Sequence, residues 1–98
     1  MDKAIRDAVR AGVVMVVAAG NESEDACDTS PSSELLAIAV GSTTDKDRPS
    51  SFSNYGACVD VYAPGSDILS ARAGSSGGTE MSGTSMASPR EFAVGVAV

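Results

Sequence analysis

Charged and apolar residues recur at helical spacing at the start of the chain. Over residues 2–11 the charged side chains fall mainly on one face of a helix, and the opposite face carries Ala4, Ile5, Ala8 and Val9. Gly12 follows at the place where a left-handed residue ends many helices. The pattern predicts an amphipathic helix over residues 2–11 that packs one face against a core.

Apolar runs farther along the chain predict three strands. Residues 13–18 (Val-Val-Met-Val-Val-Ala) show no alternation with polar residues, which is typical of a strand covered on both faces in a parallel sheet. Residues 35–40 predict a second buried strand that ends at Gly41, and residues 59–62 predict a third before the Ala-Pro-Gly of residues 63–65. A helix followed by a buried strand is half of a βαβ unit, so the predicted fold class is α/β.

Polar, turn-rich segments connect these elements. Residues 22–31 are acidic and are predicted to form a surface loop, and residues 45–49 a solvated connection. Residues 74–78 (Gly-Ser-Ser-Gly-Gly) are predicted to be a flexible loop that serves only as a connection, and they lack the Lys-Ser/Thr ending of a phosphate-binding loop.

A turn of small residues near the end of the chain, residues 82–89 (Ser-Gly-Thr-Ser-Met-Ala-Ser-Pro), runs into a segment with the composition of a buried helix. If the helix opens at Ser85, its first N–H groups lack intrahelical partners and its dipole favours negative charge. Pro89 is then predicted in the first turn, where its missing N–H is not needed. Such a turn presents Ser85 as a nucleophile beside an oxyanion site. The alternative is an ordinary helix cap.

Asn21 is the second candidate for chemistry. It follows the first predicted strand at its carboxyl end, where open α/β sheets place their ligands. Its amide is a neutral donor that suits an oxyanion. Two alternatives stay open. Gly20-Asn21 also fits a simple turn, and Asn21-Glu22-Ser23 fits the pattern of a glycosylation acceptor.

Composition and charge restrict the function further. The chain has 98 residues, 43% of them hydrophobic, which is the range of one small domain. A net charge of −6 without a basic cluster argues against nucleic acid and against an anionic membrane surface as partners. No apolar run approaches the roughly 18 residues that span a bilayer. The first residues lack the apolar core of a signal peptide, so the protein is expected either to be cytosolic or to lack its true N-terminus.

Four stretches of the chain closely resemble, in the same order, the subtilisin-like serine proteases. They are Ala-Ala-Gly-Asn (18–21), Ser-Ser-Phe-Ser-Asn-Tyr-Gly (50–56), Ala-Pro-Gly (63–65) and Gly-Thr-Ser-Met-Ala-Ser-Pro (83–89). The best match is to the proteinase K branch, particularly its secreted members of the aqualysin type, and it covers residues 1–89. The resemblance implies a subtilisin-like parallel sheet flanked by helices, and a serine endopeptidase that acts through an acyl-enzyme.

The resemblance also assigns roles within the cleft for a polypeptide substrate. Ser85 is implied as the nucleophile, and Asn21 with the Ser85 backbone N–H as the donors to the oxyanion. Two opposing walls of the pocket for the residue before the cleaved bond are implied to be formed by Ala18, Ala19 and Gly20 and by Thr29 and Ser30. These residues are small, so a broad preference for apolar side chains is predicted.

The two cysteines and one aspartate are assigned in the same way. By composition alone, Cys27 and Cys58 are unpaired thiols in a cytosolic protein or a bridge in a secreted one. The resemblance implies a disulfide between them and an extracellular parent. It also implies that Asp60 binds structural calcium together with the backbone carbonyls of Leu35 and Ala37. The alternative for Asp60 is a strand-edge carboxylate that is salt-bridged or faces water.

The chain departs from the family pattern in two places. It contains no histidine, and none of its aspartates matches the catalytic motif. Because the family order is Asp, His, Ser, residues 1–98 are expected to be the C-terminal part of a catalytic domain whose N-terminal half is missing. Residues 90–98 form an atypical tail, in which two extra residues would rotate the apolar face by roughly 200°. A truncation or a cloning scar at Glu91-Phe92 is the predicted cause.

Two other functional classes remain open. One is a catalytically dead homologue that binds peptides without cleaving them. The other is a purely structural α/β domain in which Ser85 is only a helix cap. The chain alone is expected to be inactive and to have no stable independent fold.

Overall fold

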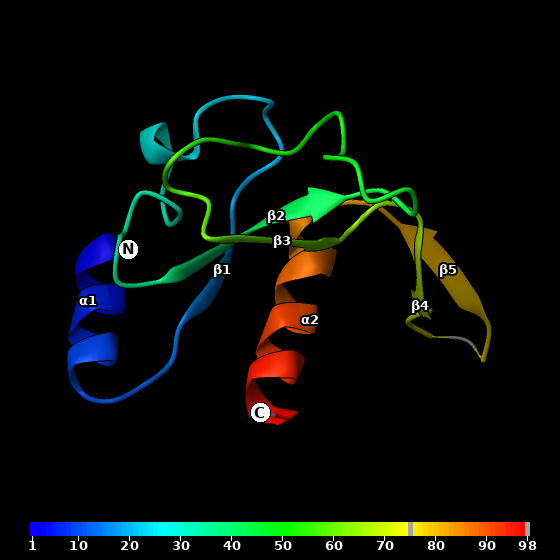
Figure 1. Cartoon of the computed structure of the whole chain (residues 1–98). Helices are drawn as coiled ribbons and strands as arrows, with labels where there is room; N and C mark the ends of the chain where they lie inside the picture. The colour runs from blue at the N-terminus through cyan, green and yellow to red at the C-terminus, as the bar shows by residue number, and fades with distance from the viewer. Residues whose placement is uncertain (75, 98) are drawn as a thin grey trace.

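The structure is a computed structural model that describes residues 1–74 and 76–97 (Figure 1). Over these residues the chain forms, in order, α1 Asp2–Arg10, β1 Val16–Ala18, the 3₁₀ turn η1 Ala26–Asp28, β2 Ile38–Thr43, β3 Val61–Pro64, β4 Ile68–Ala71, β5 Gly78–Met81 and α2 Thr84–Ala97. Strands β1, β2 and β3 form a parallel sheet, and β4 pairs with β5 in a separate antiparallel hairpin.

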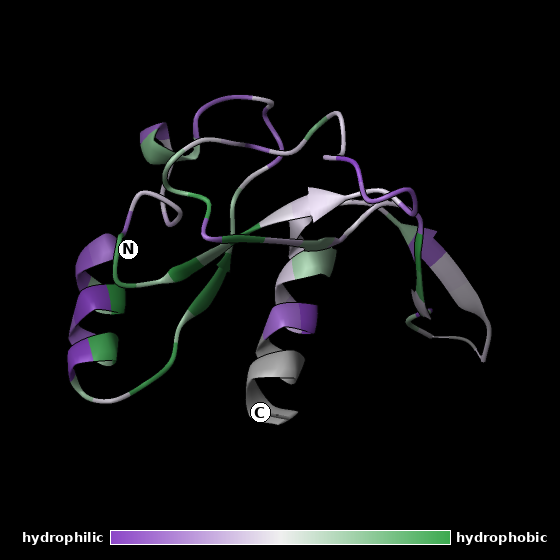
Figure 2. Cartoon of the chain, in the orientation of Figure 1, coloured by the Kyte–Doolittle hydropathy of each residue, from purple (hydrophilic) through white to green (hydrophobic). Residues whose placement is uncertain are grey.

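The first helix agrees with its prediction. It ends at Arg10, and Gly12 has the left-handed φ of 96° that the C-terminal position requires. Ile5 is 5% exposed and packs with Val17 of β1 and with Ala39 of β2. Ala4 is exposed, so the buried face is narrower than predicted. Figure 2 shows polar and apolar colours on different sides of α1.

The two long helices cover opposite faces of the parallel sheet. Val17 belongs to the cluster under α1, whereas the preceding residue Val16 packs with Val40, Ala63 and Ala87, the last of which lies on α2. Successive residues of a strand point to opposite faces, so α1 and α2 lie on different sides. The predicted α/β class is confirmed.

Strand β1 is shorter than predicted. It starts at Val16, and Val13 and Val14 are 51% and 64% exposed. Among the described residues β1 is an edge strand that pairs only with β2. The prediction of a strand buried on both faces from residue 13 was therefore wrong for this chain, because nothing in the described part covers the start of the apolar run.

Strands β2 and β3 are shifted relative to their predictions. β2 begins at Ile38, and Leu35 before it is 77% exposed. Gly41 lies inside β2 and does not end it. A Cβ at Gly41 would lie 2.5 Å from Cε1 of Tyr62, so glycine is needed there to let the ring pack on the strand. β3 spans Val61–Pro64, which includes two residues that were predicted to follow the strand.

The hairpin of β4 and β5 was not predicted. Its strands are mostly exposed and lack the alternation of a half-buried strand, so no local pattern predicted it. The predicted flexible loop over residues 74–78 overlaps the start of β5 at Gly78, and residue 75 lies outside the described residues.

Helix α2 begins at Thr84, one residue earlier than predicted. Pro89 is its sixth residue and does not lie in the first turn. Because proline has no N–H, the carbonyl of Ser85 lacks its usual helical donor. The helix continues to Ala97, and the side chains of residues 92–98 are outside what the structure describes, so the predicted rotation of the tail stays a prediction. None of the described helices is long and apolar enough to cross a membrane.

Candidate active site

Thr84 connects the loop after β1 to the start of α2. Its backbone N–H and its Oγ1 both donate to Oδ1 of Asn21 at 2.9 Å, and Oγ1 accepts the N–H of Gly20 at 3.1 Å. Because Oδ1 of Asn21 is held by two donors from Thr84, the orientation of the amide is fixed and its NH₂ group faces away from Thr84. The structure thus brings Asn21 next to Ser85, the residue that follows Thr84.

Gly83 leaves open the space between the two predicted oxyanion donors. A Cβ at Gly83 would lie 3.6 Å from Nδ2 of Asn21 and 3.8 Å from the backbone nitrogen of Ser85. Both nitrogens therefore lie within 4 Å of one position beside Gly83. The Ser85 N–H is in the first turn of α2, where no helical carbonyl can accept it. A developing oxyanion requires two such donors close to it.

The last residue of the Ala-Pro-Gly motif packs against the turn at Gly83. The N–H of Gly83 donates to the carbonyl of Gly65 at 2.7 Å, and a Cβ at Gly65 would lie 2.6 Å from the carbonyl oxygen of Gly83. The two glycines thus allow a close approach of two backbones, which explains the glycine of this motif in physical terms.

Ser85 itself is exposed and opens onto a groove. Ile68, Leu69 and Met81 of the hairpin line one side of this groove, and Met86 of α2 lines the other. The hairpin that the sequence did not reveal is therefore next to the predicted nucleophile.

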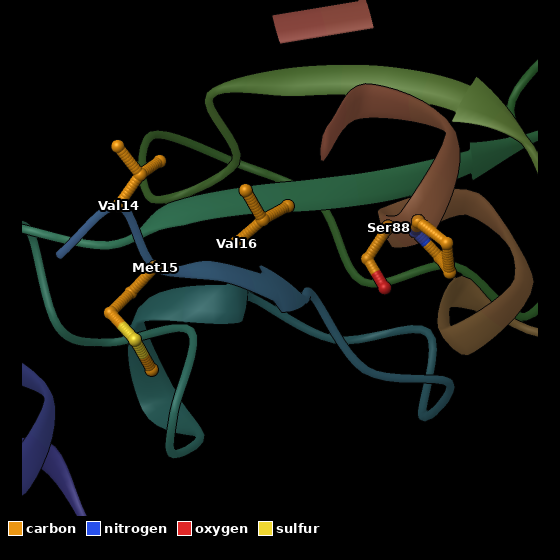
Figure 3. Close-up of a pocket in the computed structure, with 5 residues that line it drawn as sticks. Val14, Met15, Val16 and Ser88 are labelled. Carbon is orange, nitrogen blue, oxygen red and sulfur yellow. The ribbon is translucent and has the colours of Figure 1, made fainter. Parts of the chain in front are cut away.

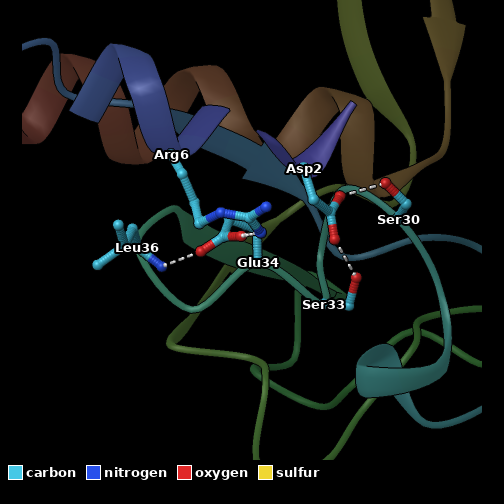
Figure 4. A network of polar contacts seen from close by, with 6 residues as sticks. All are labelled: Asp2, Arg6, Ser30, Ser33, Glu34 and Leu36. Atoms are coloured by element: carbon cyan, nitrogen blue, oxygen red, sulfur yellow. Dashed lines mark hydrogen bonds and ion pairs between the residues drawn. The ribbon is translucent and has the colours of Figure 1, made fainter. Parts of the chain in front are cut away.

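The two predicted walls of the substrate pocket meet at Asn54. Its Nδ2 donates to the carbonyl of Ala19 at 3.0 Å and makes a long contact of 3.5 Å with Oγ1 of Thr29. Ala18, Gly20 and Thr29 are half-buried. Ser30 is exposed, and its hydroxyl donates to Asp2 at the start of α1 and so is not free to line a pocket (Figure 4).

Helix α1 anchors the segment that contains the second wall. Oδ2 of Asp2 accepts a hydrogen bond from Ser33 at 2.8 Å, and Arg6 forms an ion pair of 2.6 Å with Glu34, whose side chain is 7% exposed (Figure 4). The hydrogen bonds from Ser30 and then from Ser33 hold the pKa of Asp2 below its usual value.

Cys27 and Cys58 form a disulfide with their Cα atoms 5.2 Å apart, as the family resemblance implied. The bridge joins η1 to the segment before β3 and closes a loop that contains Asn54. In the chain-entropy model a loop of 31 residues contributes about 3–4 kcal/mol to the free energy of unfolding.

Asp60 is exposed, and its Oδ2 accepts the backbone N–H of Ala39 at 2.8 Å. The hydrogen-bond partner of this carboxylate is thus a peptide group of β2. Over residues 1–74 and 76–97 no group of three or more His, Cys, Asp or Glu side chains is placed to hold a metal. A calcium ion here would depend on one carboxylate together with carbonyl oxygens and water, ligands that this cation accepts.

A hollow lies at the free edge of β1. Figure 3 shows Val14, Met15 and Val16 of the first apolar run on one side of this hollow and Ser88 on the other, and Pro89 completes its lining. A second hollow shares Val14 and Met15 and extends to α1. The apolar edge of the sheet therefore lies open beside α2.

Sequence reasoning missed Thr84 and Asn54 as residues that shape the site. Both belong to the recognised motifs, and both are 0% exposed polar side chains. The sequence placed both residues in the motifs that carry the family resemblance, which was the available signal. Only the fold shows which groups their side chains hydrogen-bond.

Comparison with known proteins gives consistent results. Residues 1–94 match the model of the subtilase family of peptidases. Over 90 residues the chain is 56% identical to a subtilisin-like serine protease of Rhodotorula mucilaginosa, 54% identical to cerevisin of Saccharomyces cerevisiae and 53% identical to an extracellular serine proteinase of a Thermus species. These matches cover 91% of this chain but 26%, 14% and 22% of the relatives, respectively.

A solved structure is similar over most of the chain. It is the crystal structure of a cold-adapted subtilisin-like serine proteinase, which superimposes with a TM-score of 0.86 and 51% sequence identity. The match covers 90% of this chain and 32% of that protein. The chain therefore spans about a third or less of the length of the proteins it resembles.

Proposed function

The chain belongs to the subtilase family and has a subtilisin-like fold, and from this premise we propose that it carries the nucleophile of a serine endopeptidase. The reaction is the hydrolysis of a peptide bond, with Ser85 as the nucleophile and Asn21 as a donor to the oxyanion. The observation that carries the proposal is the contact of Thr84 with Asn21, at 2.9 Å from both its N–H and its hydroxyl, which fixes the amide beside Ser85.

The chemistry proceeds in two steps. Oγ of Ser85 bonds to the carbonyl carbon of the substrate while its proton passes to a general base. The carbonyl oxygen becomes negatively charged and accepts hydrogen bonds from Nδ2 of Asn21 and from the N–H of Ser85. Collapse of this intermediate breaks the C–N bond, and the amine leaves with the proton from the base. Water then attacks the acyl-enzyme and releases the acid and the Ser85 hydroxyl.

The general base lies outside this chain in our proposal. The chain has no histidine, and its relatives are several times longer. We infer that the histidine and the aspartate that orients it belong to another part of the same catalytic domain. The open apolar edge of β1, with Val13 and Val14 more than half exposed, supports a missing N-terminal half as the partner that covers it. The chain alone is then inactive.

The substrate is proposed to be a polypeptide. The backbone from Ala18 to Gly20 forms one wall of the pocket for the residue before the cleaved bond, and Thr29 the other. Alanine, glycine and threonine leave room for large side chains, so apolar residues are accepted broadly. Ser30 contributes through its backbone, because its hydroxyl is bound to Asp2.

An extracellular location of the complete protein is proposed for two reasons. The Cys27–Cys58 disulfide persists in oxidising compartments, and one relative is an extracellular serine proteinase.

Structural calcium is a further part of the proposal. The carboxylate of Asp60, with the carbonyls of Leu35 and Ala37, would hold the ion, and the ion would stabilise the folded state and take no part in catalysis. Because Asp60 supplies the only charge, Asp60→Asn should abolish most of the rise in melting temperature that calcium causes. Asp67→Asn, at another exposed carboxylate, is the control. An equal calcium response in both variants would refute the site.

The absence of histidine also favours a second candidate, a homologue that binds peptides without cleaving them. Labelling of the complete protein with a fluorophosphonate separates the two functions. The proposed protease is labelled at Ser85, and Ser85→Ala abolishes both labelling and peptide cleavage. Asn21→Ala should lower kcat by about 10²–10³, the loss for an oxyanion donor in this family. A complete protein that binds peptides but is never labelled would support the second candidate.

A further inference from the structure

Asn54 is a buried side chain whose shorter side-chain hydrogen bonds all lie in the segment around the oxyanion donor, beside the 3.5 Å contact with Thr29. It is 0% exposed. Its Oδ1 accepts the backbone N–H groups of Glu22 and Glu24 at 3.0 and 3.1 Å. Its Nδ2 donates to the carbonyl of Ala19 at 3.0 Å and to Oε2 of Glu22 at 2.9 Å. Its own backbone N–H donates to the carbonyl of Gly20 at 2.9 Å.

Two of these contacts fix the backbone of Asn21. The carbonyl of Gly20 belongs to the peptide plane before the Cα of Asn21, and the N–H of Glu22 belongs to the plane after it. Because each peptide unit is rigid, holding both planes sets the two backbone dihedrals of Asn21. Asn54 therefore fixes the backbone position from which the side chain of Asn21 extends. Thr84 fixes the orientation of the Asn21 amide group.

The chemistry of this position requires an amide. The side chain must accept two N–H groups on one side and donate to a carbonyl and a carboxylate on the other, which the oxygen and the NH₂ group of asparagine do together. An aspartate has no donor for the carbonyl of Ala19, and an apolar residue takes the acceptor away from the part-buried N–H groups of Glu22 and Glu24.

Gly20 provides a second observation. Its φ is 110°, and a Cβ there would lie 2.3 Å from Nδ2 of Asn54. A side chain at this position would therefore block the approach of Asn54 to the loop.

We propose that Asn54 is a positioning residue for the oxyanion hole, acting through the backbone of Asn21. This inference rests on the proposed protease function. Asn54 does not touch the substrate. It holds the amide nitrogen of Asn21 at the distance from Ser85 at which the oxyanion forms.

The first test measures turnover in the complete protein. Asn54→Ala and the milder Asn54→Ser should lower kcat by about 10- to 100-fold, the loss expected when a catalytic group is displaced by about 1 Å. KM should change far less, because the displaced donor acts mainly in the transition state. Titration with a fluorophosphonate counts the folded enzyme, so that loss of folding is not read as loss of turnover.

Ser50→Ala is the matched control. Ser50 belongs to the same motif and is 4% exposed, but its hydroxyl bonds to Ser42 and Ser66, away from Asn21. It should lower the melting temperature while leaving kcat per titrated site unchanged. Equal kcat values for the Asn54 variants and Ser50→Ala would overturn the proposal, as would failure of both Asn54 variants to fold, which would make the role of Asn54 purely structural.

A double-mutant cycle provides the second test. If Asn54 acts through Asn21, then Asn54→Ser in an Asn21→Ala background should cost little further kcat, because the donor it positions is already gone. If Asn54→Ser lowers kcat by the same factor with and without Asn21→Ala, the proposal is overturned. If Ser85→Ala and Asn21→Ala themselves keep full turnover, the proposed function fails. If they lose turnover and the Asn54 variants do not, only the positioning role fails.

Discussion

Thr84 is completely buried, yet both of its polar groups have partners in the site. A buried hydroxyl without a partner costs free energy, so the two hydrogen bonds of Oγ1 make this position selective for a hydroxyl. The same logic applies to Asn54. At the scale of single residues, the geometry around Ser85 thus depends on buried polar side chains that are not themselves reactive.

Removing only the Thr84 hydroxyl should lower turnover. Thr84→Val keeps the shape of the side chain but leaves Oδ1 of Asn21 with one donor, so the amide is held less firmly. We expect kcat of the complete protein to fall by about 10-fold with little change in KM. Thr84→Ser retains the hydroxyl and should restore most of the loss. Equal activities of the valine and serine variants would contradict this role.

Gly20 and Gly12 form a matched pair for stability. Both have positive φ, 110° and 96°, but a Cβ at Gly20 meets Asn54 whereas one at Gly12 meets nothing within 4 Å. In the complete protein Gly12→Ala should cost about 1–2 kcal/mol of unfolding free energy from backbone strain alone. Gly20→Ala should cost at least about 2 kcal/mol more, because a buried hydrogen bond is also lost. Denaturant unfolding of both variants measures the difference, and equal losses would disprove the steric argument.

Helix α1 acts as an element that fixes the segment after η1. Ile5 packs on the sheet, Arg6 pairs with the buried Glu34, and Asp2 accepts hydrogen bonds from Ser30 and Ser33. One face of the helix therefore contributes to the core, and its first two turns hold the loop that leads to β2. The wall of the proposed pocket is adjacent to this loop.

The contact of Asp2 predicts a pH dependence. Its pKa is lowered by Ser30 and Ser33, so the carboxylate stabilises the folded state fully above its unfolded pKa, and the contribution is lost as the pH falls through the lower folded value. Ser33→Ala should raise the pKa of Asp2 towards its usual value and move acid unfolding to higher pH. NMR titration of the carboxyl carbon measures this shift. Ser70→Ala, on exposed β4, should leave the pKa unchanged, and an unchanged value in Ser33→Ala would contradict the assignment.

At the scale of the whole molecule, the parallel sheet is covered by a helix on each face but has an open apolar edge. Val13, Val14, Leu36 and Ile38 are all at least 40% exposed, and all four line the second hollow beside β1. Contiguous exposed apolar side chains are typical of an interface. In our proposal the rest of the same catalytic domain covers this edge. The relatives are much longer than this chain, which supports the existence of such a part.

The isolated chain of 98 residues should not unfold cooperatively on heating. With its apolar edge in water, it lacks part of the burial that offsets conformational entropy. Calorimetry of the chain alone and of the complete protein measures this. We expect a transition only in the complete protein, and a cooperative transition of the chain alone would show that the edge is dispensable.

The helix over residues 2–11 and the existence of three strands were predictable, because helical spacing and apolar runs are local properties. The ends of the strands were not. Leu35 and Val13 are as apolar as the residues inside the strands, and only the presence or absence of a neighbouring chain decides whether they pair. The hairpin beside Ser85 carried no local signal at all.

The sequence by itself determined the family, the candidate nucleophile Ser85 and the candidate donor Asn21, because short motifs in a fixed order carry that information. The tertiary structure decided which groups hold these residues. Asn21 and Thr84 are 63 positions apart, and Asn54 reaches residues more than 30 positions away, so no local pattern can encode their contacts. A hydrogen bond of this kind exists only after the sheet and α2 have packed, because packing brings both partners within 3 Å of each other.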